Sequence, residues 1–220
     1  MLYRDWRAGE LNVLVLALII AVSGMTSVGF FAERVELALT RESNQLLGAD
    51  LLVISSRPLP DTYADEASRL GLAISSLTKF PSMISDGENN LLTEIKAVTE
   101  GYPLRGRIHL ASRSSMSRAE QPEITIANTI PQPGTIWVDE KVMTLLDLKA
   151  NDVVDVGAAQ LTVTELVVRE PDHSVGFINM GARARINASD LSETGLIQEG
   201  SRVSYQLLVA GEVKAVQQFR

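Results

Sequence analysis

Two histidines are the first residues to consider for chemistry, because imidazole is a frequent general base and metal ligand in proteins. His109 and His173 are the only histidines; they lie far apart, and neither belongs to an HExxH motif. The run Asp172-His173-Ser174 contains the residue types of a catalytic triad. Side chains of adjacent residues diverge and cannot align as nucleophile, base and orienting group, so this run is expected to be a turn.

Acidic residues and short motifs give no better candidate. The carboxylate pairs Asp152/Asp155 and Glu170/Asp172 fall between predicted strands, where solvated loop charge is the expected role. Neither a GxxxxGK[ST] phosphate-binding loop nor a GxSxG nucleophile elbow occurs. The absence of cysteine excludes disulfides, thiolate metal sites and cysteine nucleophiles. We therefore expect no catalytic residue, no cofactor and no metal site, and we predict that the chain is not an enzyme.

The charge balance bears on the kind of partner. The 220 residues include 20 basic and 27 acidic side chains, which gives a formal net charge of −7. A chain with this balance repels phosphate backbones, so no nucleic-acid partner is expected.

A long apolar segment near the start predicts a membrane span. Residues from Leu11 to Phe31 include no charged side chain, and as a helix they would extend roughly 30 Å, the thickness of a bilayer's hydrocarbon core. A buried helix of a soluble protein is one alternative, and a signal peptide cleaved near Ala21-Val22-Ser23 is another. The acidic Asp5 and the apolar residues beyond Ser23 favour an uncleaved anchor. Basic residues flank both ends almost equally, so charge alone does not orient the helix.

One face of this predicted span consists of small residues. Ala17, Ala21, Gly24 and Val28 recur at spacings of four, three and four, which places them on one side of a helix. Small residues allow close approach of helices in lipid. A packing seam for another membrane helix and the ordinary abundance of small residues in spans are both compatible with this pattern.

The helix is predicted to continue past the membrane as a stalk. No glycine or proline interrupts the stretch between Phe30 and Leu47, and Gly48 is a plausible stop. Beyond it, alternating and short apolar runs predict a mixed α/β domain. The expected strands are Leu51–Ser55, Ala73–Phe80, Leu91–Thr99, Arg107–Ala111, Ile136–Asp139, Val153–Val156, Leu161–Arg169 and Arg202–Val209, and the expected helices are Asp61–Leu70, Glu140–Leu148 and one beginning at Glu212.

Four stretches of the chain carry a resemblance to a known family. They are Arg4-Asp5-Trp6-Arg7-Ala8-Gly9-Glu10-Leu11, Leu46-Leu47-Gly48-Ala49-Asp50-Leu51, Tyr102-Pro103-Leu104-Arg105-Gly106, and the run Ser192–Gly211. Together they resemble the YbbP-type ABC transporter permeases of the FtsX/MacB-like superfamily. The resemblance covers essentially the whole chain, and its last stretch is the most specific.

The resemblance implies an α+β fold at the bacterial inner (plasma) membrane. A single transmembrane helix would continue as a stalk into a mixed α/β periplasmic domain, porter-like, with an inserted β-rich, sabre-like subdomain. The expected divisions are a cytoplasmic N-terminus (1–10), the transmembrane helix (11–31), the stalk (32–49), the first part of the periplasmic core (50–112), the β-rich insert (113–195) and the second part of the core (196–220).

The resemblance also implies a function. The chain would be the N-terminal portion of a permease that couples a separate cytoplasmic ABC ATPase to periplasmic motion, for export or extraction of hydrophobic, lipid-like cargo. The ATPase would bind regions absent from this chain, and a periplasmic lysophospholipase or esterase is a second implied partner besides the bilayer. The alternative is a stand-alone single-span periplasmic protein that acts as a binding or scaffolding module.

Overall fold

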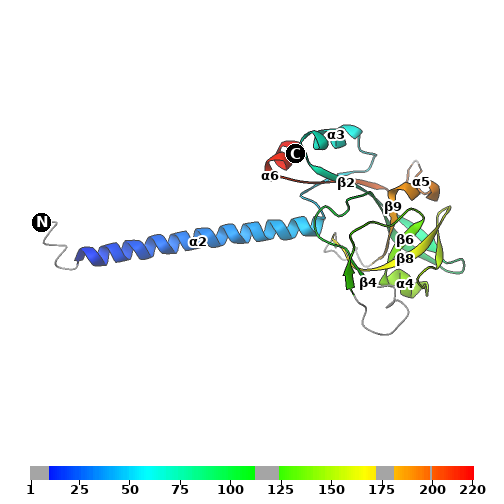
Figure 1. Ribbon diagram of the computed structural model, residues 1–220, viewed down its shortest axis with the longest axis horizontal. Coiled ribbons are helices and arrows are strands. Elements are labelled where there is room, and N and C mark those ends of the chain that lie inside the picture. Colours follow the sequence, from blue (N-terminus) through cyan, green and yellow to red (C-terminus); the bar gives the residue numbers. More distant parts are fainter. Residues whose placement is uncertain (1–9, 112–123, 172–180, 199) are drawn as a thin grey trace. The chain divides into compact units, whose positions relative to one another are not determined.

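The computed structural model describes residues 10–111, 124–171, 181–198 and 200–220, and for residues 10 and 11 it describes the backbone only (Figure 1). The chain divides into two compact units, residues 1–43 and 44–220. The run Asp172-His173-Ser174 and the basic residues Arg4 and Arg7 lie outside the described residues.

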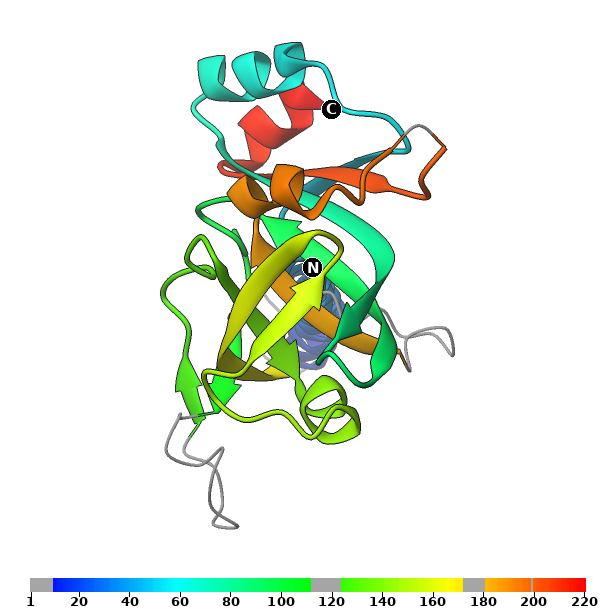
Figure 2. The same ribbon diagram turned by 90° about the vertical axis from the view of Figure 1, so that its right-hand side faces the viewer.

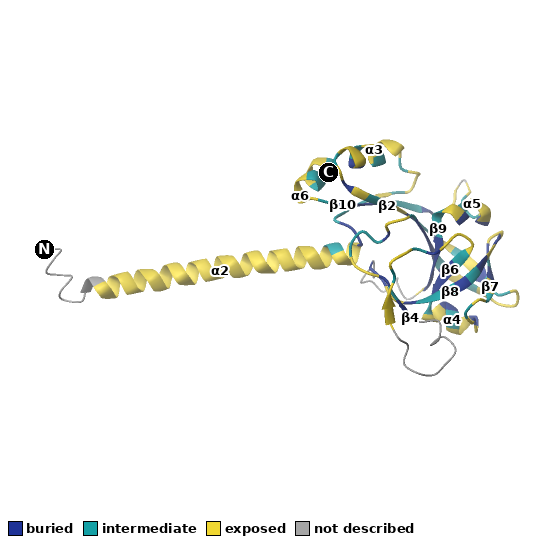
Figure 3. Cartoon of the chain, in the orientation of Figure 1, coloured by how far each residue is buried: buried dark blue, intermediate teal, exposed yellow. Residues whose placement is uncertain are grey.

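One long helix forms the described part of the first unit, and its last four residues, 44–47, belong to the second unit. Helix α2 spans Glu10–Leu47 without interruption, which confirms that the helix continues beyond the apolar segment. It contains a window with a mean hydropathy of 2.4, long and apolar enough to cross a membrane, and none of that window is buried (Figure 3). A helix that is apolar on every side needs lipid or other helices around it, because water would solvate it poorly.

The second unit is built on one mixed sheet. Its strands are hydrogen-bonded in the order β1-β10-β2-β3-β9-β6-β8-β4-β5, while β7 pairs with β2 and β8. The strands are β1 Leu51–Ser55, β2 Ala73–Ser85, β3 Asn90–Val98, β4 His109–Ala111, β5 Ile124–Ile126, β6 Thr135–Asp139, β7 Val153–Val156, β8 Ala159–Arg169, β9 Ala182–Asn187 and β10 Ser204–Ala210. The helices are α3 Asp61–Arg69, α4 Glu140–Leu145, η2 Ala188–Asp190, α5 Leu191–Thr194 and α6 Val213–Phe219.

The central strands present different side chains to the two faces of this sheet. On one face, Ile95, Ala184 and Val138 join the largest apolar cluster, which helix α4 covers through Val142. On the other face, Val98 and Trp137 belong to a second cluster. A third cluster fills the space between strands β1, β10 and β2 and the helices α3 and α6 (Figure 2). The alternation follows from the two-residue period of a strand.

Two of the turns that were predicted correctly from the sequence contain a glycine with a positive φ. Gly48 has φ +72° and directly follows α2, a conformation that glycine adopts without the steric penalty of a side chain. Gly157 has φ +63° in the turn from β7 to β8, and a Cβ there would lie 2.2 Å from the carbonyl oxygen of Thr194. An alanine at position 157 would therefore force the backbone apart.

The predicted and observed bounds agree well for the short apolar strands. Strands β1 and β7 have the predicted bounds, and β2 continues five residues further than expected, to Ser85. Strands β5 and β9 were not expected. Helix α4 ends at Leu145 rather than at Leu148. Strands from both the expected core and the expected insert join the same sheet, and the division at residues 112 and 195 stays a prediction.

Candidate functional site

The Asp50 carboxylate joins four segments of the second unit. It accepts hydrogen bonds from Arg105 Nε (2.9 Å), Asn44 Nδ2 (2.9 Å) and the backbone N–H of Gly211 (3.0 Å). The backbone N–H of Arg105 also donates to the carbonyl of Gly48 at 2.8 Å. Asn44 belongs to the last turns of α2, Asp50 precedes β1, and Gly211 follows β10.

These contacts bring together three of the four stretches that carry the family resemblance. Asp50, Arg105 and Gly211 each come from a different stretch, separated by 55 or more positions in the sequence. A charged pair of this kind, in which each group is also held by backbone contacts, fixes geometry better than a single exposed ion pair does. We call this set of residues (Asn44, Gly48, Asp50, Arg105 and Gly211) the Asp50 junction.

A second arrangement of charge lies on the sheet face that carries Trp137. In the strand register, Lys79 pairs with Lys96, Lys96 with Arg185, and Arg185 with Trp137. Side chains paired in this way point to the same face of the sheet. Three cationic side chains therefore stand in one row across β2, β3 and β9. Like charges side by side repel each other and require a compensating anion.

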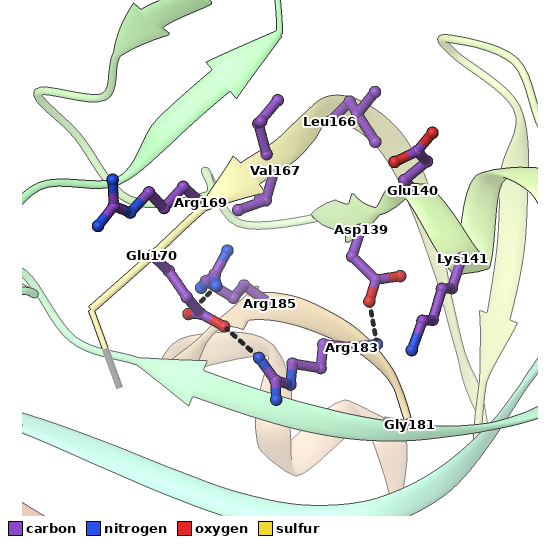
Figure 4. Close-up of a pocket in the computed structure, with 11 residues that line it drawn as sticks. Asp139, Glu140, Lys141, Leu166, Val167, Arg169, Glu170, Gly181, Arg183 and Arg185 are labelled. Carbon is purple, nitrogen blue, oxygen red and sulfur yellow. Dashed lines mark hydrogen bonds and ion pairs between the residues drawn. The ribbon is translucent and has the colours of Figure 1, made fainter. Parts of the chain in front are cut away.

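Glu170 supplies a carboxylate to this row. It follows β8, and its Oε1 lies 3.2 Å from Lys96 Nζ. The same oxygen lies 3.8 Å from Arg183 Nη1, while Oε2 contacts Arg185 Nη2 (Figure 4). Exposed fractions are 0% for Lys96, 6% for Glu170, 9% for Arg183 and 3% for Arg185. The expectation that Glu170 is a solvated loop charge was therefore wrong. Three cations draw this carboxylate out of solvent and against the sheet.

Asp139 approaches the same group from the end of β6. Its Oδ2 accepts a hydrogen bond from the backbone N–H of Arg183 (3.0 Å), and its Oδ1 caps α4 through the N–H of Val142 (2.9 Å). Burial raises the pKa of the Asp139 carboxyl, although both hydrogen bonds oppose the rise. Burial also lowers the pKa of the Arg185 guanidinium, although its interaction with Tyr102 and the negative charge of Asp139 oppose the fall.

The structure does not bring the other sequence candidates into one site. His109 is half-buried at the start of β4. Asp152 directly precedes β7, but Asp155 lies within that strand and pairs with Gln160 of β8, so the expectation of a loop position was wrong for Asp155. Ala17, Ala21, Gly24 and Val28 lie within α2, and nothing approaches within 4 Å of a Cβ built at Gly24. Their role as a seam stays a prediction. Among the described residues, no group of three or more His, Asp or Glu could hold a metal ion.

Sequence reasoning did not find the buried charge group. Arg183 and Arg185 occur in the run Ala182–Asn187, where arginine alternates with small or aliphatic residues. Such alternation is compatible with a half-buried strand, and this was the one sequence feature that could have indicated it. The contact with Lys96 depends on the parallel pairing of β3 with β9, which is a property of the fold.

Part of a known permease is similar to this chain in sequence. The chain is 31% identical over 209 residues to the uncharacterized ABC transporter permease YbbP of Escherichia coli (strain K12), a match that covers 95% of the chain and 24% of the permease. No family model matches the chain.

Two solved structures match much of the chain at low sequence identity. The periplasmic region of MacB from Actinobacillus actinomycetemcomitans matches with a TM-score of 0.45 and 12% identity, over 81% of this chain and 84% of that one. The extracellular domain of the noncanonic ABC-type transporter YknZ from Gram-positive bacteria matches with a TM-score of 0.47 and 7% identity, over 77% and 88%.

The apolar helix and the similarity to a permease both indicate a membrane protein. A helix with the length and hydropathy of α2, in a homologue of a permease, makes this an inner-membrane protein with a single span in the described residues. The chain is thus similar to one region of an ABC transporter permease, and it spans about a quarter of the length of the relative that it matches.

Proposed function

We propose that the chain forms part of the membrane-spanning permease of an ABC transporter, with residues 44–220 on the periplasmic side. The observation that carries this proposal is the 31% identity to a permease over 95% of the chain. The chain has no reaction of its own in this proposal. It serves to pass motion driven by a separate cytoplasmic ATPase to the domain outside the membrane.

The Asp50 junction is the part of the structure best suited to pass such motion. Through Asp50, the last turns of α2 contact the first strand, the loop around Arg105 and the end of β10. A displacement of residues 44–47 would therefore reach β1 and β10, which are adjacent in the sheet. A short, charge-assisted contact transmits force better than a flexible linker, because it holds one geometry.

The cargo in this proposal is hydrophobic or lipid-like, and an esterase of the lysophospholipase type is a further partner. Both follow from the family resemblance of the four sequence stretches. Export or extraction of such a molecule would require the permease to change shape outside the bilayer while the ATPase hydrolyses ATP inside the cell.

The test captures the protein with its partners from bacterial membranes. An affinity tag inserted before Met1 in the chromosome retains whatever polypeptide follows, and purification in mild detergent is followed by mass spectrometry. The expected result is co-purification of an ATPase that contains a GxxxxGK[ST] loop. A mutation that unfolds the nucleotide site of this ATPase should abolish its co-purification with the chain. Recovery of the chain without any ATPase would contradict the permease role and favour a stand-alone binding or scaffolding protein.

The location of the domain is tested separately. Protease added to spheroplasts should cut the region after α2. The same protease added to intact cells should leave this region uncut. Resistance in spheroplasts and cleavage only after lysis would place the domain in the cytoplasm, and would defeat the proposal independently of any partner.

A further inference from the structure

The end of α2 is held from a second side by the backbone at Gly106 and by Pro171. A Cβ built on Gly106 would lie 2.9 Å from the carbonyl oxygen of Gln45 and 2.8 Å from Cγ of Pro171. Pro171 also lies beside Gly48, because a Cβ built on Gly48 would be 3.7 Å from Cβ of Pro171. Gln45 belongs to the last turn of α2, Gly48 directly follows the helix, and all four residues belong to the second unit. The helix end, Gly106 and Pro171 are therefore packed without room for a side chain at residue 106.

Pro171 connects this contact to the buried charge group. It is buried and directly follows Glu170, whose Oε2 contacts Arg185 and whose side chain is 3% exposed (Figure 4). The proline ring fixes φ of residue 171 and restricts the residue before it to extended backbone. Rotation between the two residues therefore absorbs little movement, and a shift of Pro171 displaces the backbone of Glu170.

Displacement of Glu170 has an energetic consequence, because its interactions are out of solvent. Its Oε1 lies 3.2 Å from Lys96 Nζ, and Lys96, in β3, is 0% exposed. Arg185 contacts the same carboxylate from β9, the parallel neighbour of β3. A buried ion pair offsets the cost of its desolvation only while its geometry is good. A shift of the Glu170 backbone would therefore weaken its interactions with both strands.

We propose that Gly106 and Pro171 couple the end of α2 to the buried charge group, so that a shift of residues 45–48 alters the interactions of Glu170 with β3 and β9. The Asp50 junction leads from the same helix end to β1 and β10, so the domain would receive motion at two separate places. The inference rests on the proposed function for the source of that motion, whereas the coupling is a property of the second unit.

A double-mutant cycle in the complete chain measures the coupling. Lys96→Met removes a cation that contacts Glu170, and Gly106→Ala forces residue 106 away from its neighbours. The protein is purified in an uncharged maltoside detergent and unfolded with urea. Trp137, which is 4% exposed, reports unfolding by its fluorescence, and Trp6→Phe in every variant removes the other indole.

The two substitutions should not act independently. Effects of independent substitutions multiply in the unfolding equilibrium constant, to within about two-fold. With the coupling, Gly106→Ala already weakens the interaction between Glu170 and Lys96. The factor by which Lys96→Met raises the unfolding constant should then be at least about three times smaller in Gly106→Ala than in the parent. Equal factors in the two backgrounds would overturn the proposal.

Gly71→Ala is the matched control. Gly71 has φ +69° against +76° for Gly106, so an alanine meets a similar backbone strain at both positions. Nothing lies within 4 Å of a Cβ built on Gly71. The effect of Lys96→Met should therefore be the same in Gly71→Ala as in the parent. A reduction as large as that in Gly106→Ala would assign the result to general destabilisation and would overturn the proposal.

Asp50→Ala separates the two contacts at the helix end. The hydrogen bonds of Asp50 lie within the Asp50 junction, so its loss loosens the junction without adding a side chain at residue 106. Lys96→Met should keep its full effect in Asp50→Ala. A reduction equal to that in Gly106→Ala would mean that the junction, rather than Gly106 and Pro171, carries the coupling, and would contradict the proposal.

Gly48→Ala keeps the proposal testable if Gly106→Ala folds poorly. A Cβ at residue 48 is milder, because the nearest atom, Cβ of Pro103, is 3.5 Å away, while the φ of +72° strains the turn after α2. Lys96→Met should again have a smaller effect in this background than in Gly71→Ala. Equal effects in Gly48→Ala and Gly71→Ala would contradict the proposal.

Failure of this coupling and failure of the proposed function are distinguishable. Capture of the chain without an ATPase would leave the cycle unchanged, whereas equal factors in every background would remove the coupling and leave the permease role intact.

Discussion

The guanidinium of Arg105 binds both carboxylate oxygens of Asp50, through Nε to Oδ1 at 2.9 Å and through Nη2 to Oδ2 at 2.5 Å. The two residues are 55 positions apart in the sequence. Asp50 is the less exposed of the pair, with 15% of its side chain accessible against 40% for Arg105. The remaining hydrogen bonds of Asp50 reach Asn44 and Gly211, so the pair is the centre of a larger contact rather than an isolated surface ion pair.

Asp50→Ala should lower the free energy of unfolding of the second unit by about 2–3 kcal/mol, because it removes the acceptor for three donor groups, one of them charged. Urea denaturation followed by circular dichroism measures the loss. Glu66→Ala is the control, since Glu66 pairs with Arg69 on the surface of α3, and the midpoint should not move measurably. Equal effects of the two substitutions would show that the Asp50 junction is no more than a surface pair.

Glu170→Gln should destabilise the fold more than Lys96→Met does. Removing Glu170 leaves three cations together, whereas removing Lys96 leaves Glu170 with Arg183 and Arg185. Loss of one partner from a buried ion pair costs about 3–5 kcal/mol, and we expect Glu170→Gln to fall in this range and Lys96→Met below it. Chemical denaturation in a buffer of chloride salts provides both values. A larger loss for Lys96→Met would mean that Glu170 does not set the balance of charge.

Local sequence patterns were sufficient to predict those elements whose conformation depends on their own residues rather than on distant contacts. Strand β1 is a short apolar run between Gly48 and Arg57, and α2 is a long run of helix formers without proline, so each was predicted from its own residues. Strand β9 was not expected, because its buried arginines look like surface residues when read alone. Their burial depends on Lys96 and Glu170, which lie 74 positions apart and reach the arginines only in the folded sheet.

The stability of the domain should depend on pH through Asp139. Because burial raises the pKa of this carboxyl above its ordinary value of 3.8, the folded state keeps its proton at a pH where the unfolded chain has released it. The folded state then binds more protons, so stability falls as pH rises from about 3.8 through the folded pKa, and is constant above it. The fall should be absent in Asp139→Asn.

The measurement compares urea midpoints of the parent and Asp139→Asn from pH 3.5 to 7. The loss of one hydrogen bond to Val142 or Arg183 adds an offset that does not vary with pH. A difference between the two proteins that stays constant over this range, or that grows in favour of the parent as pH rises, would contradict the assignment.

Gly24→Leu should weaken association of α2 with other membrane helices if Ala17, Ala21, Gly24 and Val28 form a seam. A leucine side chain separates two backbones that a glycine allows to touch. Single cysteines introduced at Val28 in the cysteine-free chain report the association through disulfide crosslinking in membranes. Leu18→Ile, on a different side of the helix, is the control. An unchanged crosslinking yield in Gly24→Leu would remove the seam from consideration.

Leu39→Pro should uncouple ATP hydrolysis from the periplasmic domain in a complete permease that contains this chain. Residue 39 lies inside α2, eight positions before its last residue, Leu47. Proline removes a backbone donor and collides with the preceding turn, at a cost of about 3 kcal/mol or more, so the helix bends or breaks there. The readout is stimulation of the partner ATPase by cargo in proteoliposomes, with basal ATPase activity retained. Leu39→Ala keeps the helix and should keep the stimulation. Normal stimulation in Leu39→Pro would mean that an unbroken α2 is not what carries the motion to the Asp50 junction.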